Sequence, residues 1–90
     1  MKMHLGARVP NEGARKIARS IARDFGGDLD RAAARMRTSA TFLQRMIDGT
    51  MEPGFATGNL LARLCGVRAG DFNRPAEAGW FDGDAARMAA

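Results

Sequence analysis

The side chains best suited to chemistry lie in one short stretch, SATFLQRMIDG (residues 39–49). Its polar members Thr41, Gln44 and Arg45 alternate with apolar residues at a spacing that separates the two kinds onto different faces of a helix. In the major groove of a duplex, a glutamine amide can form two hydrogen bonds with adenine, and an arginine guanidinium can do so with guanine. This stretch therefore carries the side chains of a helix that reads base edges.

Covalent and metal chemistry have weaker candidates. The sequence has one cysteine and one histidine, so Cys65 and His4 cannot assemble a zinc site or a Cys–His nucleophile within one chain. The apolar neighbours of Cys65 in LLARLCG favour a small buried hydrophobe over a reactive thiol. The acidic pairs next to glycines are Asp28 with Asp30 and Asp82 with Asp84. Such pairs are typical of turns and helix starts, and we expect no enzyme, cofactor or metal.

The charge distribution is uneven along the chain. Residues 1–45 hold ten Lys and Arg against four Asp and Glu, whereas residues 46–90 hold four against six. Twelve of the fourteen basic residues are arginines, whose planar guanidinium suits phosphate and guanine better than the ammonium of lysine. A solvated basic surface would have the same composition, but the asymmetry favours a polyanionic partner.

The length and the hydropathy pattern indicate one small domain. Ninety residues are about the minimum for a self-sufficient core, and no apolar run reaches the roughly 18 residues of a membrane span. The opening MKMHLGARVP lacks the apolar core of a secretion signal, so we expect a cytoplasmic protein. We divide it into a flexible N-terminal arm (residues 1–10), a helical domain (residues 11–74) and a C-terminal tail (residues 75–90).

Helical periodicity predicts an all-α fold of four to five short helices. The expected helix caps are Asn11, Asp28 and Ser39, and the expected stops are Gly26, Gly49 and Gly66. The apolar positions expected to face the core are Ala14, Ile17, Ala18, Ile21 and Phe25, then Leu29, Ala32, Ala33 and Met36, then Leu43, Met46 and Ile47, and finally Phe55, Leu60, Leu61 and Leu64. The segment VRAGDF adds one more turn that carries Val67 and Phe72.

The second and third predicted helices, joined by a short turn, match the helix-turn-helix plan. A helix held to the core by one narrow edge leaves its other face free to enter a major groove about 12 Å wide. Ala40 and Thr41 near its start are small enough to approach base edges, so the expected base contacts are Ala40, Thr41, Gln44 and Arg45. An exposed Arg45 paired with a nearby acid is the plainer alternative, and Phe42 suits core or dimer packing better than contact with thymine.

Residues 28–72 resemble the Cro/CI family of helix-turn-helix domains, which have the lambda-repressor-like fold. The resemblance rests on DRAAARMRTSATFLQRMIDG, on Pro53 four residues after Gly49, and on LARLCGVRAGDF. It implies that Ala33 packs the second helix against the third. The family's closing pattern is echoed by Leu61, Ala62, Gly66, Val67 and Phe72.

The chain departs from the family at several positions, and these departures concern its contacts with the DNA backbone. Arg37 stands where the turn usually has Gly, Ile47 stands where many members have Glu, and Leu29 stands between two aspartates where members often have a phosphate-contacting Gln. The loop after Gly49 is not basic either. We therefore expect other residues to contact phosphate: Arg15, Lys16, Arg35, Arg37, Ser39 and Thr50. For Arg35 and Arg37, a merely solvated face is the alternative.

The resemblance implies a sequence-specific regulator of transcription that binds double-stranded DNA, a phage or mobile-element repressor on an inverted repeat. It also implies a homodimer whose interface lies in the part of the chain that follows the third helix. The residues expected in this interface are Phe55, Leu60, Phe72, Trp80 and Phe81. Packing of Trp80 and Phe81 onto the core, or stacking on bases, are alternatives. A rival hypothesis is an antitoxin-like or adaptor module whose tail from Pro75 binds a protein partner.

Overall fold

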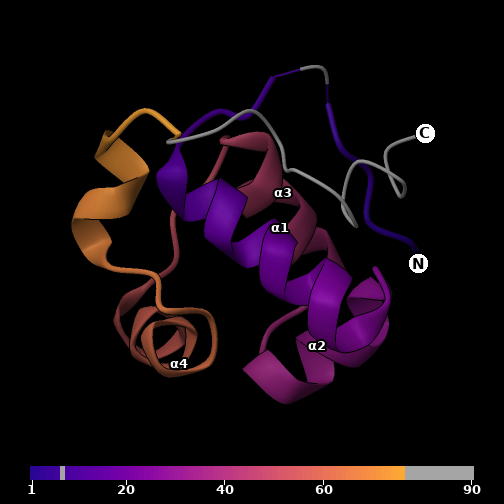
Figure 1. The fold of residues 1–90 in the computed structure, drawn as a ribbon. Coiled ribbons are helices and arrows are strands. Elements are labelled where there is room, and N and C mark those ends of the chain that lie inside the picture. Colours follow the sequence, from indigo (N-terminus) through magenta and orange to yellow (C-terminus); the bar gives the residue numbers. More distant parts are fainter. Residues whose placement is uncertain (7, 77–90) are drawn as a thin grey trace.

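The computed structural model describes residues 1–6 and 8–76, which form an all-helical unit (Figure 1). Its elements are α1 (Glu12–Phe25), α2 (Leu29–Met36), α3 (Ala40–Asp48), α4 (Phe55–Cys65) and a short 3₁₀-helix, η1 (Ala69–Asn73). The predicted all-α class is confirmed. Within the described part of the chain, no helix is long and apolar enough to cross a bilayer.

Local capping chemistry sets the helix boundaries. The side chains of Asn11, Asp28 and Ser39 accept hydrogen bonds from the first-turn N–H groups of α1, α2 and α3, which would otherwise lack partners. At the end of α3, Gly49 has a φ of 80°, and a Cβ atom there would lie 2.5 Å from Pro10 Cβ. Only glycine satisfies both the left-handed backbone and this close approach.

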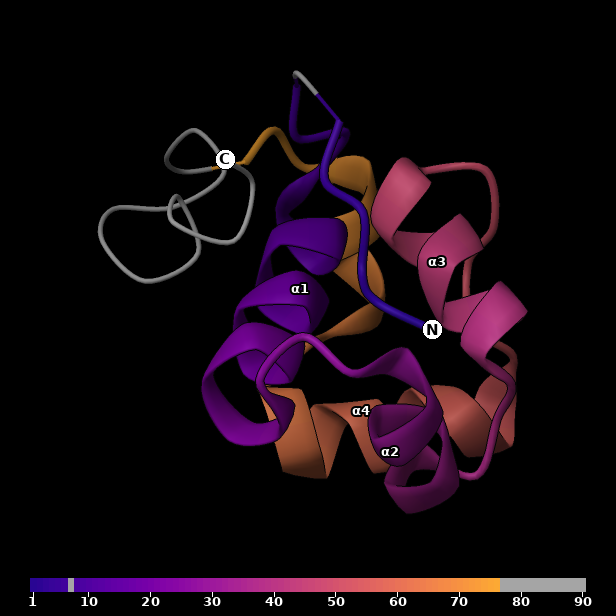
Figure 2. The same cartoon turned by 90° about the vertical axis from the view of Figure 1, so that its right-hand side faces the viewer.

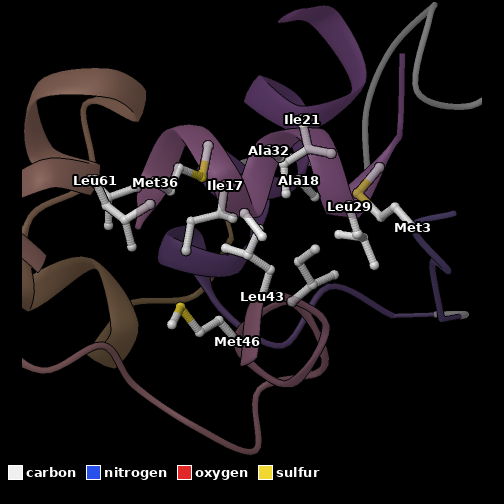
Figure 3. Packing of buried hydrophobic residues seen from close by; sticks show 13 residues of the cluster. Met3, Ile17, Ala18, Ile21, Leu29, Ala32, Met36, Leu43, Met46 and Leu61 are labelled. Atoms are coloured by element: carbon white, nitrogen blue, oxygen red, sulfur yellow. The ribbon is translucent and has the colours of Figure 1, made fainter. Parts of the chain in front are cut away.

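The core is built around α1 (Figure 3), and the predicted inner faces of α1, α2 and α3 are mostly buried. The prediction for α4 is wrong in one place, because Phe55 is 89% exposed whereas Leu61 is fully buried. At about 100° per residue, Phe55 lies roughly 180° around the helix from Leu64 and about 120° from Leu61. Its position in the helical phase, rather than its hydrophobicity, excludes it from the core.

The first residues of the chain lie against the helices (Figure 2), where the sequence predicted a flexible arm. From the start of α2, where the N-terminus lies, they run between α1 and α3. The Met3 N–H donates to the carbonyl of Gly27 at 2.8 Å, and the Leu29 N–H donates to the carbonyl of Met1 at 2.8 Å. Met3 is buried in the core cluster, so this segment is part of the packed domain.

The 3₁₀-helix η1 folds back onto the start of α1. The Phe72 ring covers Gly13 so closely that a Cβ atom at Gly13 would lie 2.6 Å from Phe72 Cδ1. The Glu12 N–H donates to the carbonyl of Arg74 at 3.0 Å. The beginning and the end of the predicted 11–74 domain are therefore in contact.

Candidate nucleic-acid interface

Helix α3 is held to the domain by one edge. Leu43, Met46 and Ile47 are at most 1% exposed. On the other side, Thr41 and Arg45 are exposed and Phe42 is 43% exposed. This narrow buried edge agrees with the sequence prediction, and it leaves much of the helix surface facing solvent.

Three of the four predicted base-contacting residues lie on or beside this exposed surface. Ala40 is half-buried at the helix start, whereas Thr41 and Arg45 are exposed. The Arg45 guanidinium has no hydrogen bond or ion pair with any other residue of the described part. The plainer alternative for Arg45, an ion pair with a nearby acid, is not found there.

The fourth predicted base contact, Gln44, is engaged inside the domain. Its Oε1 accepts the His4 N–H at 3.0 Å, and its Nε2 donates to the His4 carbonyl at 2.9 Å. The same Nε2 donates to Asp48 Oδ1 at 2.9 Å. The amide groups that would bond adenine are thus used to hold the start of the chain against α3.

Two of the predicted phosphate contacts are also used internally. Arg15 donates to both carboxylate oxygens of the buried Glu12 at 2.6 Å, and its side chain is only 12% exposed. Lys16 Nζ lies 2.9 Å from Asp71 Oδ2 and donates to the carbonyl of Gly66 at 3.3 Å. These two side chains stabilise the start of α1 and its contact with η1.

The negative charge of Asp71, the buried partner of Lys16, is stabilised by hydrogen bonds and by positive charges. Burial alone would raise its pKa, but the Arg68 N–H, the Lys16 ammonium and the nearby Arg74 charge together hold the pKa of Asp71 below its ordinary value. The Arg68 N–H and Arg74 Nη1 lie 2.9 and 3.0 Å from its oxygens. The cluster therefore keeps an ionised carboxylate inside the domain.

The two hydroxyl groups predicted to touch phosphate differ in what they can still do. Ser39 Oγ accepts the Phe42 N–H at 3.1 Å, which leaves its own hydrogen available for a phosphate oxygen. Thr50 Oγ1 donates its hydrogen to the carbonyl of Arg45 at 3.2 Å. Thr50 therefore stabilises the end of α3 and cannot donate to phosphate at the same time.

The aspartates at the start of α2 have local partners. Asp28 Oδ1 accepts the N–H groups of Asp30 and Arg31 at 3.0 and 3.2 Å, and Asp30 pairs with the Met1 ammonium. An isolated β-bridge joins Asp28 to Lys2, so an exposed lysine stands beside the start of α2. The sequence analysis missed Lys2, because only the docked arm brings it there.

Arg35 and Arg37 lie at the end of α2 and in the turn before α3. Both are exposed, and neither side chain has a hydrogen bond or ion pair with another described residue. Arg37 has a φ of 53° and is the only residue other than glycine with a positive φ in the described part. An arginine thus occupies a left-handed backbone position directly after a helix, where glycine is the usual residue.

The predicted dimer residues fall on two different surfaces. Phe55 and Phe72 both line a groove of about 760 Å³ between the start of α4 and η1. Leu60 lines a separate hollow beside α2. Trp80 and Phe81, together with the rest of the tail from residue 77, lie outside the described residues.

Two further observations concern metal and thiol chemistry in the described residues. In the described part of the chain, no three His, Cys, Asp or Glu side chains are grouped to hold a metal ion. Burial raises the pKa of the Cys65 thiol, which disfavours the reactive thiolate. Comparison of the chain with protein-family models, with curated proteins and with solved structures found no match.

Proposed function

We propose that this chain is a transcription regulator of the cytoplasm, a repressor that binds double-stranded DNA sequence-specifically through α3. The observation that carries the proposal is the position of Arg45, whose exposed guanidinium has no partner among the described residues, on a helix whose buried edge is Leu43, Met46 and Ile47. A guanidinium so placed can form two hydrogen bonds with guanine, and the methyl group of Thr41 can contact thymine. Gln44 is assigned instead to the N-terminal arm.

The proposed phosphate contacts are three exposed basic side chains at the two ends of α2. Lys2 stands at the start of α2, and Arg35 and Arg37 stand at its end. Neutralising phosphates releases condensed counterions, so affinity should fall with salt at a log–log slope of roughly −0.9 per contact. Arg15 and Lys16 are excluded from this set by their buried carboxylate partners.

We further propose that the protein binds an inverted repeat as a homodimer, because a single helix-turn-helix contacts too few base pairs to specify a site. Phe55 supports a protein contact at the groove, since its ring is 89% exposed. Phe72 lines the same groove, and contiguous exposed apolar surfaces are typical of interaction sites.

The experiment is selection of bound duplexes from a random pool, followed by measurement on the selected site. Arg45→Ala should weaken binding by about 1–3 kcal/mol and relax the preference at one base position. Arg19→Ala, which removes an exposed arginine of α1, is the matched control and should leave the preference unchanged. A pool without enriched sequences would contradict the proposal and favour the adaptor hypothesis.

A further inference from the structure

A hollow of about 280 Å³ lies between the end of α2 and one side of α4. Its charged lining consists of Arg35, Arg37 and Arg63, and Thr57 adds a hydroxyl group. The rest of the lining is apolar and consists of Met36, Ala56 and Leu60. No carboxylate lines the hollow. A water molecule occupies roughly 30 Å³ in the liquid, so the hollow has room for an oxyanion together with some of its water.

Three guanidinium groups around one hollow repel one another unless an anion compensates them. None of the three forms a hydrogen bond or ion pair with another residue of the described part. Three other arginines behave differently, because Arg15, Arg23 and Arg74 each pair with a carboxylate. No carboxylate of the described residues therefore pairs with these three cations.

The backbone of Arg37 is a second, independent observation. A left-handed conformation is strained for any residue with a Cβ atom, and glycine is the usual choice directly after a helix. Arg37 nevertheless adopts a φ of 53° there. Strained residues that persist cluster at binding and functional sites, and this one presents a guanidinium to the hollow.

We propose that Arg35, Arg37, Arg63 and the Thr57 hydroxyl form a binding site for a phosphate group, and that this group belongs to the DNA backbone. Arginine forks match phosphate oxygens in pairs, and a hydroxyl donates one further hydrogen bond. The choice of a backbone phosphate rests on the proposed function. The phosphate-binding site itself does not rest on the proposed function, because a free phosphate would bind it through the same chemistry. Arg63 brings α4 into the interface, since α4 lies next to α2 (Figure 2).

The site is tested by titrating the full chain with inorganic phosphate at constant ionic strength and following backbone amide resonances. The amides of Arg37, Thr57 and Arg63 should shift and saturate. Arg63→Gln should raise the dissociation constant about fivefold, and Thr57→Val, which keeps the side-chain shape, should raise it less. Arg19→Gln removes the same charge outside the hollow and should leave the constant unchanged. Shifts that do not saturate, or equal effects of Arg63→Gln and Arg19→Gln, would overturn the site and leave these arginines as charges that complement helix ends.

The source of the phosphate is tested with the selected duplex. Arg63→Gln should reduce the magnitude of the log–log salt slope by about 0.9 relative to wild type, whereas Arg19→Gln should not. A saturating phosphate titration with no change in slope would overturn the backbone assignment and indicate a free phosphate ligand. A wild-type chain that binds no duplex, yet saturates with phosphate, would refute the proposed function while supporting the site.

Discussion

The side-chain amide of Gln44 on α3 is paired with the backbone of His4, forty positions earlier in the chain: the two hydrogen bonds measure 3.0 and 2.9 Å. A glutamine amide has both a donor and an acceptor, so it satisfies an N–H and a carbonyl that would otherwise have to find water. The residue that the sequence presents as the best reader of adenine thus secures the N-terminal arm beside the candidate interface.

Gln44→Ala should loosen this arm. Loss of the paired hydrogen bonds should lower the free energy of unfolding by about 1 kcal/mol and speed hydrogen exchange at the Met3 amide, which donates to Gly27. Gln44→Glu should act more strongly, because it removes the donor and places a second carboxylate beside Asp48. Urea unfolding and amide exchange measure both effects. Thr41→Ala is the control on the exposed face of α3, and exchange at Met3 that is the same in all variants would refute this role.

Arg37→Gly should stabilise the domain. Glycine relieves the left-handed strain of roughly 1–2 kcal/mol, and its greater freedom in the unfolded chain offsets part of that gain. We expect a net increase of up to about 1 kcal/mol in the free energy of unfolding, measured in urea. The same variant should bind duplex with a shallower salt dependence. A loss of stability would show that the Arg37 side chain makes interactions that outweigh its backbone strain.

The fold could be predicted from the sequence because its determinants are local. Asn11, Asp28 and Ser39 cap helices through N–H groups two or three residues away. Each apolar stripe repeats within one helix, so it needs no knowledge of the partner that covers it. The exposure of Phe55 is also a local property, and its angle relative to Leu61 and Leu64 would have revealed it.

The candidate site was harder to predict, because contacts with residues far along the chain decide which side chains remain available for a ligand. Lys16 is paired with Asp71, which follows it by 55 positions, and Gln44 is engaged by a segment 40 positions away. Arg63 meets Arg35 and Arg37 only because α4 packs against α2. A sequence pattern shows which residues are basic, whereas the tertiary contacts decide which of them remain free.

The ionised Asp71 should make the domain sensitive to acid. Its folded pKa is lower than the ordinary value of 3.8, so its contribution is fully present above that pH and is lost as pH falls through the lower folded value. Asp71→Asn should be less stable at neutral pH and should show a flatter decline of unfolding free energy below about pH 4. Urea unfolding between pH 2 and pH 7 measures both.

Asp24→Asn is the matched control for this pH dependence. Its pKa is lowered too, chiefly by the hydrogen bond from Arg23 and further by Ser20, but the side chain is exposed and solvent screens the interaction. The decline of the unfolding free energy of this variant at acid pH should therefore stay close to that of wild type. If Asp71→Asn shows the same decline of unfolding free energy at acid pH as wild type, other carboxylates govern acid unfolding.

Phe55→Ser should separate dimer formation from folding. The ring is 89% exposed, so its removal should change the free energy of unfolding of the monomer by no more than about 0.5 kcal/mol. If the groove between α4 and η1 seats a second copy, losing this apolar side chain should raise the dimer dissociation constant about tenfold or more. Sedimentation of the full chain without DNA measures this. Phe42→Ser, which removes a 43% exposed ring on α3, should leave the dimer intact. Equal weakening by both variants would indicate non-specific apolar association, and a wild-type chain that is monomeric at tens of micromolar would refute the stable dimer.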